Sequence, residues 1–329
     1  MKLKFASIGT SAICSLFIEG ALKSKKYELV AVYSRNEESG RAFADKHGAK
    51  LVFTNLNELT ESKEFDAVYV ASPNSLHFEQ AKLILKSKKH VICEKPIFST
   101  VNELEKAFQL AEENGVFLFE AVRNIHDPNF VVLQNAVGLV GSIQNVLLQY
   151  CQYSSRYDKF LAGEEPNIFS TKYSGGALVD LGVYPINLAV SLFGKPNETH
   201  YHAMKLSNGI DGAGTLILKY EGFNCTIIAS KISAGQSTSE IQGVNGSLVL
   251  GDTTSLSELS FVSHKTTEST KLETTRIDNN MIYEADVIAD AILLKDSLKY
   301  LSCKKLSHIV LQITEKSRHQ NGIFFEAEK

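Results

Sequence analysis

The chain has 329 residues, of which 44% are hydrophobic, and its net charge at pH 7 is -3. This length exceeds that of one compact domain, so we expect two domains, each able to bury a full core. The near-balanced charge argues against a strongly basic surface, and so against nucleic acid as a main partner.

The five cysteines are far apart and form no C-x-x-C pair. This pattern predicts reduced thiols in a cytoplasmic protein rather than a disulfide framework or a metal site. The N-terminus lacks the apolar core of a signal peptide, and no apolar run approaches the roughly 18 residues of a membrane span. We therefore expect no membrane partner.

The first 120 residues alternate between apolar runs and amphipathic segments. Strands are predicted at residues 4–8, 27–33, 49–53, 67–71, 90–93 and 117–120, with the weakest pattern at 49–53. Helices are predicted between them, at 13–23, 37–46, 75–86 and 101–114. Such alternation is typical of a parallel sheet with helices on both faces, and right-handed crossovers make it a doubly wound α/β domain over residues 1–121.

After residue 121 the pattern changes to short strands with β-branched residues and turn signals. Strands are predicted at 146–150, 213–220, 223–230, 238–243 and 247–250, and helices at 176–193, 284–301 and 304–320. This order predicts an α+β domain over residues 122–329, with a mostly antiparallel sheet and helices on one side.

The first strand runs into Gly9, which permits a tight turn, and the helix start at Ser11, Ala12 and Ile13 can attract a phosphate. The dinucleotide fingerprint G-x-G-x-x-G would also place glycines at Ser11 and Cys14. Serine still allows close backbone approach, and cysteine is small enough for helix packing. The segment is either a cofactor loop or an ordinary strand–helix turn.

The second strand ends at Ser34 and Arg35, where a site specific for NAD usually carries an acidic residue. Arginine can pair with a 2′-phosphate. We therefore predict NADP, with NAD possible because Glu37 and Glu38 follow closely. The alternative is a surface arginine in a turn.

Three further motifs stand in order along the chain: "SPNSLH" at residues 72–77, "CEKP" at 93–96 and "GGALVDLGVYPIN" at 175–187. Together with the opening loop they resemble the Gfo/Idh/MocA family of NAD(P)-dependent oxidoreductases. Many members have histidine where this chain has Tyr184. Tyrosine at that position is similar to dimeric dihydrodiol dehydrogenases, glucose–fructose oxidoreductase and some xylose dehydrogenases.

The resemblance implies a Rossmann domain followed by an open sheet that forms a homodimer or a higher homo-oligomer. It also implies that later glycines of the loop can be replaced. By the same resemblance, Ser72, Pro73 and Asn74 border the cofactor, His77 lies near the nicotinamide and Glu94 contacts its ribose. His77 is open to a second interpretation, as an ordinary residue at a helix start.

Lys95 follows the carboxyl end of a parallel strand, where such folds bind ligands. Asp180 and Tyr184 are four residues apart and share a face if the segment is helical. A phenol, with a pKa of roughly 10, is a plausible proton donor to an alkoxide. Our hypothesis is that Tyr184 is the general acid during reduction, that Lys95 polarises the reacting oxygen, and that Asp180 positions the substrate or orients Lys95. The alternative is a core helix and a surface lysine.

These residues predict an oxidoreductase that transfers a hydride between NADP(H) and a CH–OH or C=O group of a sugar, polyol or vicinal diol. Two alternatives stay open. One is a glycosidase-type member of the family that holds its NAD tightly, and the other is a protein that senses NAD(P) without catalysis. The segment 151–174 is expected to contact the substrate, without a ranking of its residues.

Overall fold

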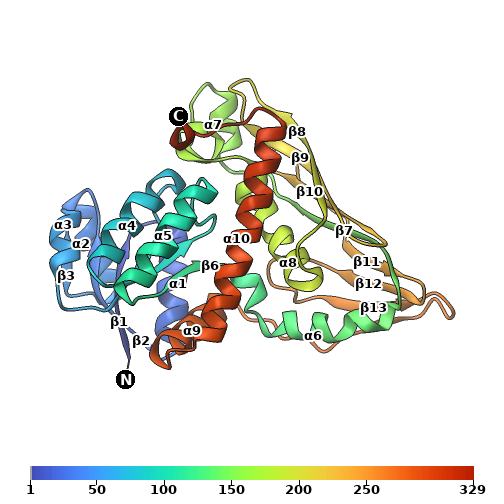
Figure 1. Ribbon diagram of the computed structural model, residues 1–329, viewed down its shortest axis with the longest axis horizontal. Coiled ribbons are helices and arrows are strands. Elements are labelled where there is room, and N and C mark those ends of the chain that lie inside the picture. Colours follow the sequence, from blue (N-terminus) through green and yellow to red (C-terminus); the bar gives the residue numbers. More distant parts are fainter. Residues whose placement is uncertain (1) are drawn as a thin grey trace. The chain divides into compact units, whose positions relative to one another are not determined.

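The computed structural model describes residues 2–329, and the chain divides into two compact units (Figure 1). The first contains residues 1–121 and 278–308, and the second contains residues 122–277 and 309–329. Sequence analysis placed residues 278–308 in the second domain. The structure groups them with the first because α9 (Met281–Leu293) packs on α1 (Ala12–Lys23). The hydroxyl of Tyr27, at the start of the second strand, also donates a 2.9 Å hydrogen bond to the Ala285 carbonyl on α9.

The first unit is built on a six-stranded sheet in which every pair of neighbours is parallel. Its order is β3-β2-β1-β4-β5-β6, with strands β1 (Leu3–Ile8), β2 (Tyr27–Tyr33), β3 (Leu51–Phe53), β4 (Ala67–Val70), β5 (His90–Glu94) and β6 (Leu118–Ala121). The order reverses between β1 and β4. The predicted doubly wound sheet is confirmed, and this reversal marks the place where such sheets bind ligands.

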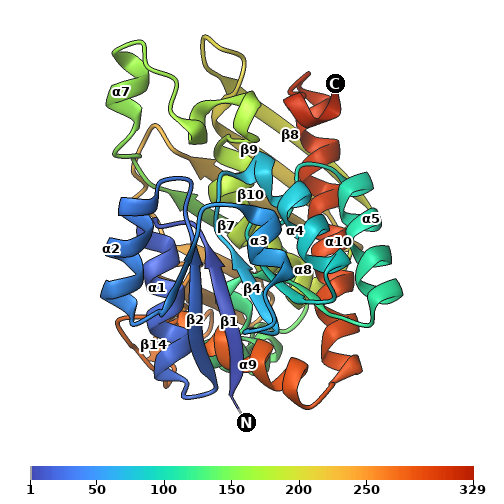
Figure 2. The ribbon, with the colours of Figure 1, turned by 90° about the vertical axis from the view of Figure 1, so that its left-hand side faces the viewer.

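Helices cover both faces of this sheet, with α1 and α2 on one side and α4 and α5 on the other (Figure 2). Besides α1, the helices of this part are α2 (Glu37–His47), α3 (Leu56–Glu61), α4 (His77–Lys86) and α5 (Val101–Asn114). Between the sheet and α1, the rings of Phe17 and Tyr69 stack with centroids 3.8 Å apart. All four residues of β4 are buried, as expected for a strand covered on both faces.

The second unit is built on an eight-stranded sheet of order β14-β13-β12-β11-β7-β10-β9-β8. The strands are β7 (Ile143–Cys151), β8 (Glu198–Lys205), β9 (Asp211–Lys219), β10 (Asn224–Ser230), β11 (Ser239–Gly243), β12 (Gly246–Leu250), β13 (Leu259–Ser263) and β14 (Ser269–Lys271). All pairs are antiparallel except β7 with β10. In β11 and β12 buried residues alternate with half-buried ones, so this sheet has one well-covered face.

The helices of the second unit are α6 (Pro128–Ala136), α7 (Tyr157–Leu161) and α8 (Val183–Phe193), the last preceded by a π-helical turn, η6 (Leu178–Gly182). Helix α10 (Ser297–Gln320) begins in the first unit and ends in the second. Short 3₁₀ turns lie at Asn74–Leu76, Arg123–Ile125, Val137–Val140, Asn167–Phe169, Thr171–Tyr173 and Glu326–Glu328.

The break between the last two helices lies earlier than predicted. Sequence analysis placed it at residues 302–303, whereas α9 ends at Leu293 and α10 runs unbroken from Ser297. Lys295 has a φ of 54°, in the left-handed region that ends a helix. Nothing in the sequence marks a lysine for that conformation.

One helical segment, Thr171–Phe193, is long and apolar enough by composition to cross a membrane, with a mean hydropathy of 1.5. Sequence analysis expected no such segment. Because 78% of the tested window is buried inside the protein, this segment has the surroundings of a core helix.

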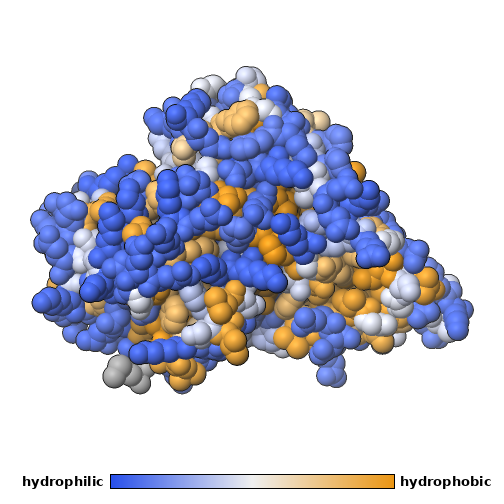
Figure 3. Space-filling model, in the orientation of Figure 1, coloured by the Kyte–Doolittle hydropathy of each residue, from blue (hydrophilic) through white to orange (hydrophobic). Residues whose placement is uncertain are grey.

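Apolar side chains also gather on the surface over α6 and the strands beside it (Figure 3), and Val131 on α6 is 53% exposed.

Candidate active site

The turn after β1 depends on Gly9. Its φ is +114°, and a Cβ atom at this position would lie 2.6 Å from the carbonyl oxygen of Ala71. Both features require glycine. The turn therefore brings the backbone that follows β1 against the backbone that follows β4, at the reversal point of the sheet.

Helix α1 begins directly after this turn and is capped by Ser11, whose Oγ accepts the Cys14 N–H at 3.4 Å. The first bond within the helix runs from the Ser15 N–H to the Ser11 carbonyl, so the N–H groups of Ala12 and Ile13 precede it and can serve a phosphate. Cys14 is fully buried. A helix cap and a core residue thus occupy the two places where the fingerprint has glycine.

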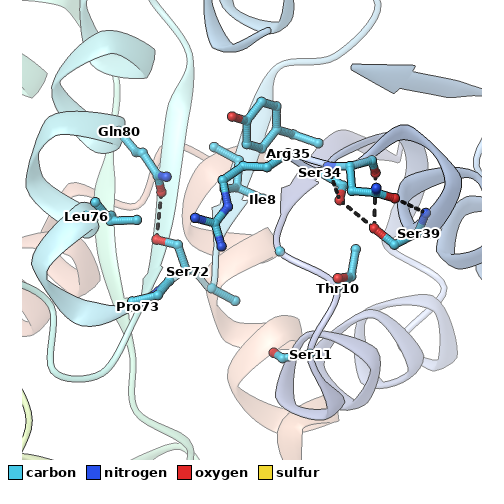
Figure 4. Close-up of a pocket in the computed structure, with 14 residues that line it drawn as sticks. Ile8, Thr10, Ser11, Ser34, Arg35, Ser39, Ser72, Pro73, Leu76 and Gln80 are labelled. Carbon is cyan, nitrogen blue, oxygen red and sulfur yellow. Dashed lines mark hydrogen bonds between the residues drawn. The ribbon is translucent and has the colours of Figure 1, made fainter. Parts of the chain in front are cut away.

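Several polar residues cluster around Ser34 at the end of β2. The Ser34 and Ser39 hydroxyls lie 3.0 Å apart, and the Asn36 N–H donates to Ser34 Oγ at 3.3 Å. Arg35 is exposed and extends into the space between Thr10 on one side and Ser72 and Pro73 on the other (Figure 4). The end of β2 thus combines a bonded serine pair with a cation that reaches across the opening.

The acidic residues that follow Arg35 do not share this space. Glu37 lies in the first turn of α2 and forms an exposed ion pair with Arg41 at 2.8 Å. Neither Glu37 nor Glu38 is among the described residues that line the cavity. The structure therefore gives no support to the idea that Glu37 or Glu38 binds the ribose of NAD.

These strand ends enclose a cavity of about 550 Å³, to which the loop after β4 contributes a hydrogen bond from Ser72 Oγ to Gln80 Oε1 at 2.7 Å. Six predicted cofactor residues line it: Gly9, Ser11, Ser34, Arg35, Ser72 and Pro73. Polar residues that sequence reasoning missed also line it: Thr10, Asn36, Ser39 and Gln80. Among the described residues of the lining, Arg35 is the only charged one, so the cavity suits an anionic group near Ser34 and Ser39.

The other predicted cofactor residues do not line this cavity: Ala12, Ile13, Asn74, His77, Glu94 and Lys95. His77 is fully buried, with Nδ1 3.1 Å from the Pro96 carbonyl oxygen and Nε2 2.9 Å from the Ser72 carbonyl oxygen. Burial lowers the pKa of His77, although these oxygens act in the opposite direction. The ring therefore links the loop after β4 to the loop after β5, and its contact with a nicotinamide stays a prediction.

Lys95 is half-buried and directly follows β5, where the Lys95–Pro96 peptide bond is cis. The residue before it, Glu94, is buried and accepts a 2.5 Å hydrogen bond from the Tyr69 hydroxyl. Lys95 thus stands at the carboxyl end of a strand inside the sheet, beside a carboxylate that a core tyrosine holds in place.

A second carboxyl group, Glu120 at the end of β6, accepts the Ile97 N–H at 3.1 Å. The pKa of Glu120 is raised to about 7, mainly by burial and also by the nearby Glu94, while bonds from Ser307 and Ile97 and the charge of Lys95 act in the opposite direction. The loop that carries Lys95 is therefore held from β6 by a group that titrates near neutral pH.

In the second unit, the second glycine of the "GG" in the third motif is explained by Asp211. Gly176 has a φ of +117°, and a Cβ atom there would lie 2.2 Å from Asp211 Oδ1. Asp211 Oδ2 accepts the Leu178 N–H and the Tyr201 hydroxyl, each at 2.8 Å. Burial raises the pKa of Asp211 to about 6, although these bonds lower it. This carboxyl group fixes the start of η6.

The π-helical turn η6 carries Asp180, and α8 follows at once with Tyr184. Single π-helical turns occur frequently at functional sites. Tyr184 is 5% exposed, with the Arg123 guanidinium 5.5 Å from its ring centroid and the Tyr150 ring edge-on at 5.7 Å. Asn124 Nδ2 donates to the Tyr184 carbonyl at 3.0 Å. The phenol is thus held in a defined position with a cation over its face.

Asp180 forms an ion pair with Lys231, a residue that sequence reasoning missed. Lys231 follows β10 directly, and its side chain is only 3% exposed. The available signal was a lysine placed at the end of an apolar strand. Lys95 belongs to the first unit, whereas Asp180, Tyr184 and Lys231 belong to the second.

Within residues 2–329, one group of side chains is close enough together to hold a metal ion: Glu315, His319 and Glu328. Glu328 already pairs with His319 and with Arg318. These direct ion pairs account for the cluster, and we assign no metal to it.

Comparison with known families decides the assignment. Residues 3–122 match the model for the oxidoreductase family with an NAD-binding Rossmann fold, and residues 136–249 match the GFO/IDH/MocA C-terminal domain. The chain belongs to the Gfo/Idh/MocA family. The predicted family and enzyme class are confirmed, and the chain is an oxidoreductase that binds NAD(P).

Two bacterial relatives match almost the full length. An uncharacterized oxidoreductase of Escherichia coli, YgjR, is 40% identical over 99% of this chain and 98% of its own. The scyllo-inositol 2-dehydrogenase (NADP(+)) IolU of Bacillus subtilis is 39% identical over 99% of both chains. Trans-1,2-dihydrobenzene-1,2-diol dehydrogenase of Danio rerio is 29% identical over 65% of this chain and 63% of its own.

Solved structures support the fold. The 3-ketoreductase KijD10 of Actinomadura kijaniata, in complex with TDP-benzene and NADP, gives a TM-score of 0.84 at 20% identity and covers 97% of both chains. At this identity the match shows the fold alone. The roles of individual residues, Lys95, Asp180 and Tyr184 included, stay predictions.

Proposed function

We propose that this protein transfers a hydride between NADP(H) and a CH–OH or C=O group of a sugar, a polyol or a vicinal diol. The observation that carries the proposal is the cavity at the carboxyl ends of β1, β2 and β4, with Arg35 as its charged residue. The names of the relatives, an inositol dehydrogenase among them, support the substrate class.

The residues of the cavity fit a dinucleotide. The backbone at Gly9 leaves the space that a Cβ atom would fill, which suits the close approach of a pyrophosphate. Ser34, Arg35 and Ser39 offer hydroxyl groups and a guanidinium to a 2′-phosphate, and the NADP in the name of the inositol dehydrogenase supports the same choice. NAD would leave the guanidinium without its phosphate.

A bound NADP(H) would supply the hydride chemistry at the reacting carbon, as acceptor or as donor. In the oxidative direction the substrate hydroxyl gives its proton to the ionised oxygen of Tyr184 as the C–H bond breaks, and in reduction the Tyr184 hydroxyl returns it. Lys95 donates a hydrogen bond to the reacting oxygen and stabilises its negative charge. By this proposal the second unit supplies Tyr184 and the residues that bind the rest of the substrate.

Two further parts of the proposal concern the whole molecule. The half-buried face of the second sheet supports a homodimer formed through that sheet. The five cysteines are all free, which supports a reducing, cytoplasmic location. Light scattering of the purified protein tests the first part.

The decisive experiment is a fluorescence titration with NADPH and with NADH. We expect NADPH to bind more tightly, and Arg35→Ala to weaken NADPH binding by about tenfold, the value of a partly exposed charge-assisted hydrogen bond. Arg41→Ala, on the exposed side of α2, is the matched control and should leave both affinities unchanged. Equal binding of NADPH and NADH, unaffected by Arg35→Ala, would refute the choice of NADP.

Turnover is tested next with NADP and a panel of neutral polyols that includes scyllo-inositol. We expect Tyr184→Phe to lower kcat by about 10²–10⁴, as for the loss of a positioned acid, with little change in NADPH affinity. Full turnover by Tyr184→Phe would refute the role of the phenol and leave the cofactor assignment intact.

A further inference from the structure

Lys231 is a charged residue in an unusual environment. Lysine is almost never fully buried unless it is paired, and here a 3% exposed side chain pairs with Asp180, whose side chain is 26% exposed. A buried ion pair adds little net stability, because desolvation of the two charges offsets their attraction. The pair therefore calls for an explanation other than stability.

Both the backbone and the ammonium group of Lys231 are held in place. The Lys231 N–H donates to the Gly212 carbonyl at 2.8 Å, and its carbonyl accepts the Ser154 N–H at 2.8 Å. The ammonium lies 5.6 Å from the ring centroid of Phe169, which is itself fully buried. The cation is thus a fixed part of the second unit, and the position of the Asp180 carboxylate is set against it.

The two members of the pair differ in access to solvent. The ammonium is buried and the carboxylate is partly exposed, so the carboxylate is the part that an incoming molecule can reach. A carboxylate has about four lone-pair positions, so it can accept further hydrogen bonds while it stays paired with lysine. It attracts hydroxyl donors and repels anionic groups.

We infer that Lys231 is a positioning residue for substrate recognition, which fixes the Asp180 carboxylate so that it accepts hydrogen bonds from hydroxyl groups of an uncharged polyol. This inference rests on the proposed function and narrows its substrate class. Sugar acids and sugar phosphates are disfavoured, because their charge would meet the exposed side of Asp180. It also gives Asp180 a role in binding the substrate rather than in orienting Lys95.

The test compares Lys231→Met, which keeps the length and removes the charge, with Lys231→Arg, which keeps the charge. Lys219→Met is the control, because Lys219 forms an exposed ion pair with Glu198 in the same unit. KM and kcat for scyllo-inositol, the affinity for NADPH and the pH profile of kcat/KM are measured for each variant. Glucuronate serves as the anionic probe.

We expect Lys231→Met to raise KM by about tenfold or more, with NADPH affinity within about twofold of the wild type. The acid limb of kcat/KM should move to higher pH, because the cation that favours the ionised carboxylate is gone. Lys231→Arg should recover part of the KM effect, and the wild type should prefer scyllo-inositol to glucuronate.

Unchanged KM and pH profile in Lys231→Met would overturn the inference, as would a wild-type preference for glucuronate. If Lys231→Met fails to fold, Asp180→Asn replaces it, and there the inference requires a raised KM with normal NADPH binding. If the wild type binds NADPH but turns over no polyol, the proposed function fails instead. Calorimetry of polyol binding to the wild type and to Lys231→Met then still tests the role of Lys231.

Discussion

Glu120 makes the stability of this protein depend on pH near neutrality. In the folded protein burial raises the pKa of Glu120 from 4.5 to about 7. At about 1.4 kcal/mol per pKa unit, this difference corresponds to about 3 kcal/mol. The folded state holds the proton more tightly than the unfolded chain does. The stabilising contribution is therefore complete below pH 4.5 and is lost as the pH rises through about 7.

The perturbation is Glu120→Gln, which keeps the oxygen that accepts the Ile97 N–H and cannot ionise. Chemical unfolding of wild type and variant is followed at pH 4.5, 6, 7 and 8. We expect the stability difference between variant and wild type to move in favour of the variant by about 3 kcal/mol across this range. Effects of the substitution that do not depend on pH cancel in this comparison.

Glu38→Gln, at an exposed position on α2, is the control for the loss of a carboxyl group that is not buried. A stability difference that stays constant from pH 4.5 to 8 would refute the reasoning, because Glu120 would then titrate alike in the folded and unfolded chain. A difference that moves in favour of the wild type would refute it as well, since it would mean that the ionised carboxylate is the stabilised form.

Four more substitutions test the two units separately. Gly9→Ala places a Cβ atom against the carbonyl of Ala71, so we expect NADPH binding to be lost in a fluorescence titration and the melting temperature to fall. Cys14→Gly restores a fingerprint glycine, yet it should cost about 2–3 kcal/mol in chemical unfolding, through a cavity and a helical glycine, and leave NADPH affinity within about twofold. Asp211→Ala removes the acceptor of the Tyr201 hydroxyl and of the Leu178 N–H, so the free energy of unfolding should fall by about 2–5 kcal/mol, and kcat/KM should fall as well. Tyr201→Phe removes only one of these two bonds and should have the smaller effect on both quantities.

Local sequence patterns were enough to predict the strands of the first sheet. Its strands are apolar runs bounded by turn signals, and each predicted strand matches an observed one within about two residues. The strand ends then located Gly9, Ser34 and Arg35 at one edge, because the carboxyl ends of parallel strands meet there. For these three residues, sequence alone was enough to predict their place in the fold.

Features that depend on contacts distant in the sequence could not be predicted in this way. Lys231 and Asp180 are 51 residues apart, and only the packing of η6 on β10 brings them together. Residues 278–308 form amphipathic helices. An amphipathic pattern shows that a helix packs with one face against the protein, but it does not identify the element on which the helix packs. Polar residues of the cavity such as Ser39 and Gln80 carry no motif of their own, so sequence alone could not separate them from other surface residues.

The opening loop shows why its departure from the fingerprint leaves a cofactor site possible. Glycine is required at position 9, because the backbone there has a positive φ and meets the backbone after β4. At position 11 the residue is a helix cap with extended backbone, a place that serine fills well, and at position 14 a small side chain packs into the core. The replacements therefore fall on the two positions where the geometry accepts a side chain. What the loop must keep for phosphate binding is the turn at Gly9 and the helix start beyond it, and this chain keeps both.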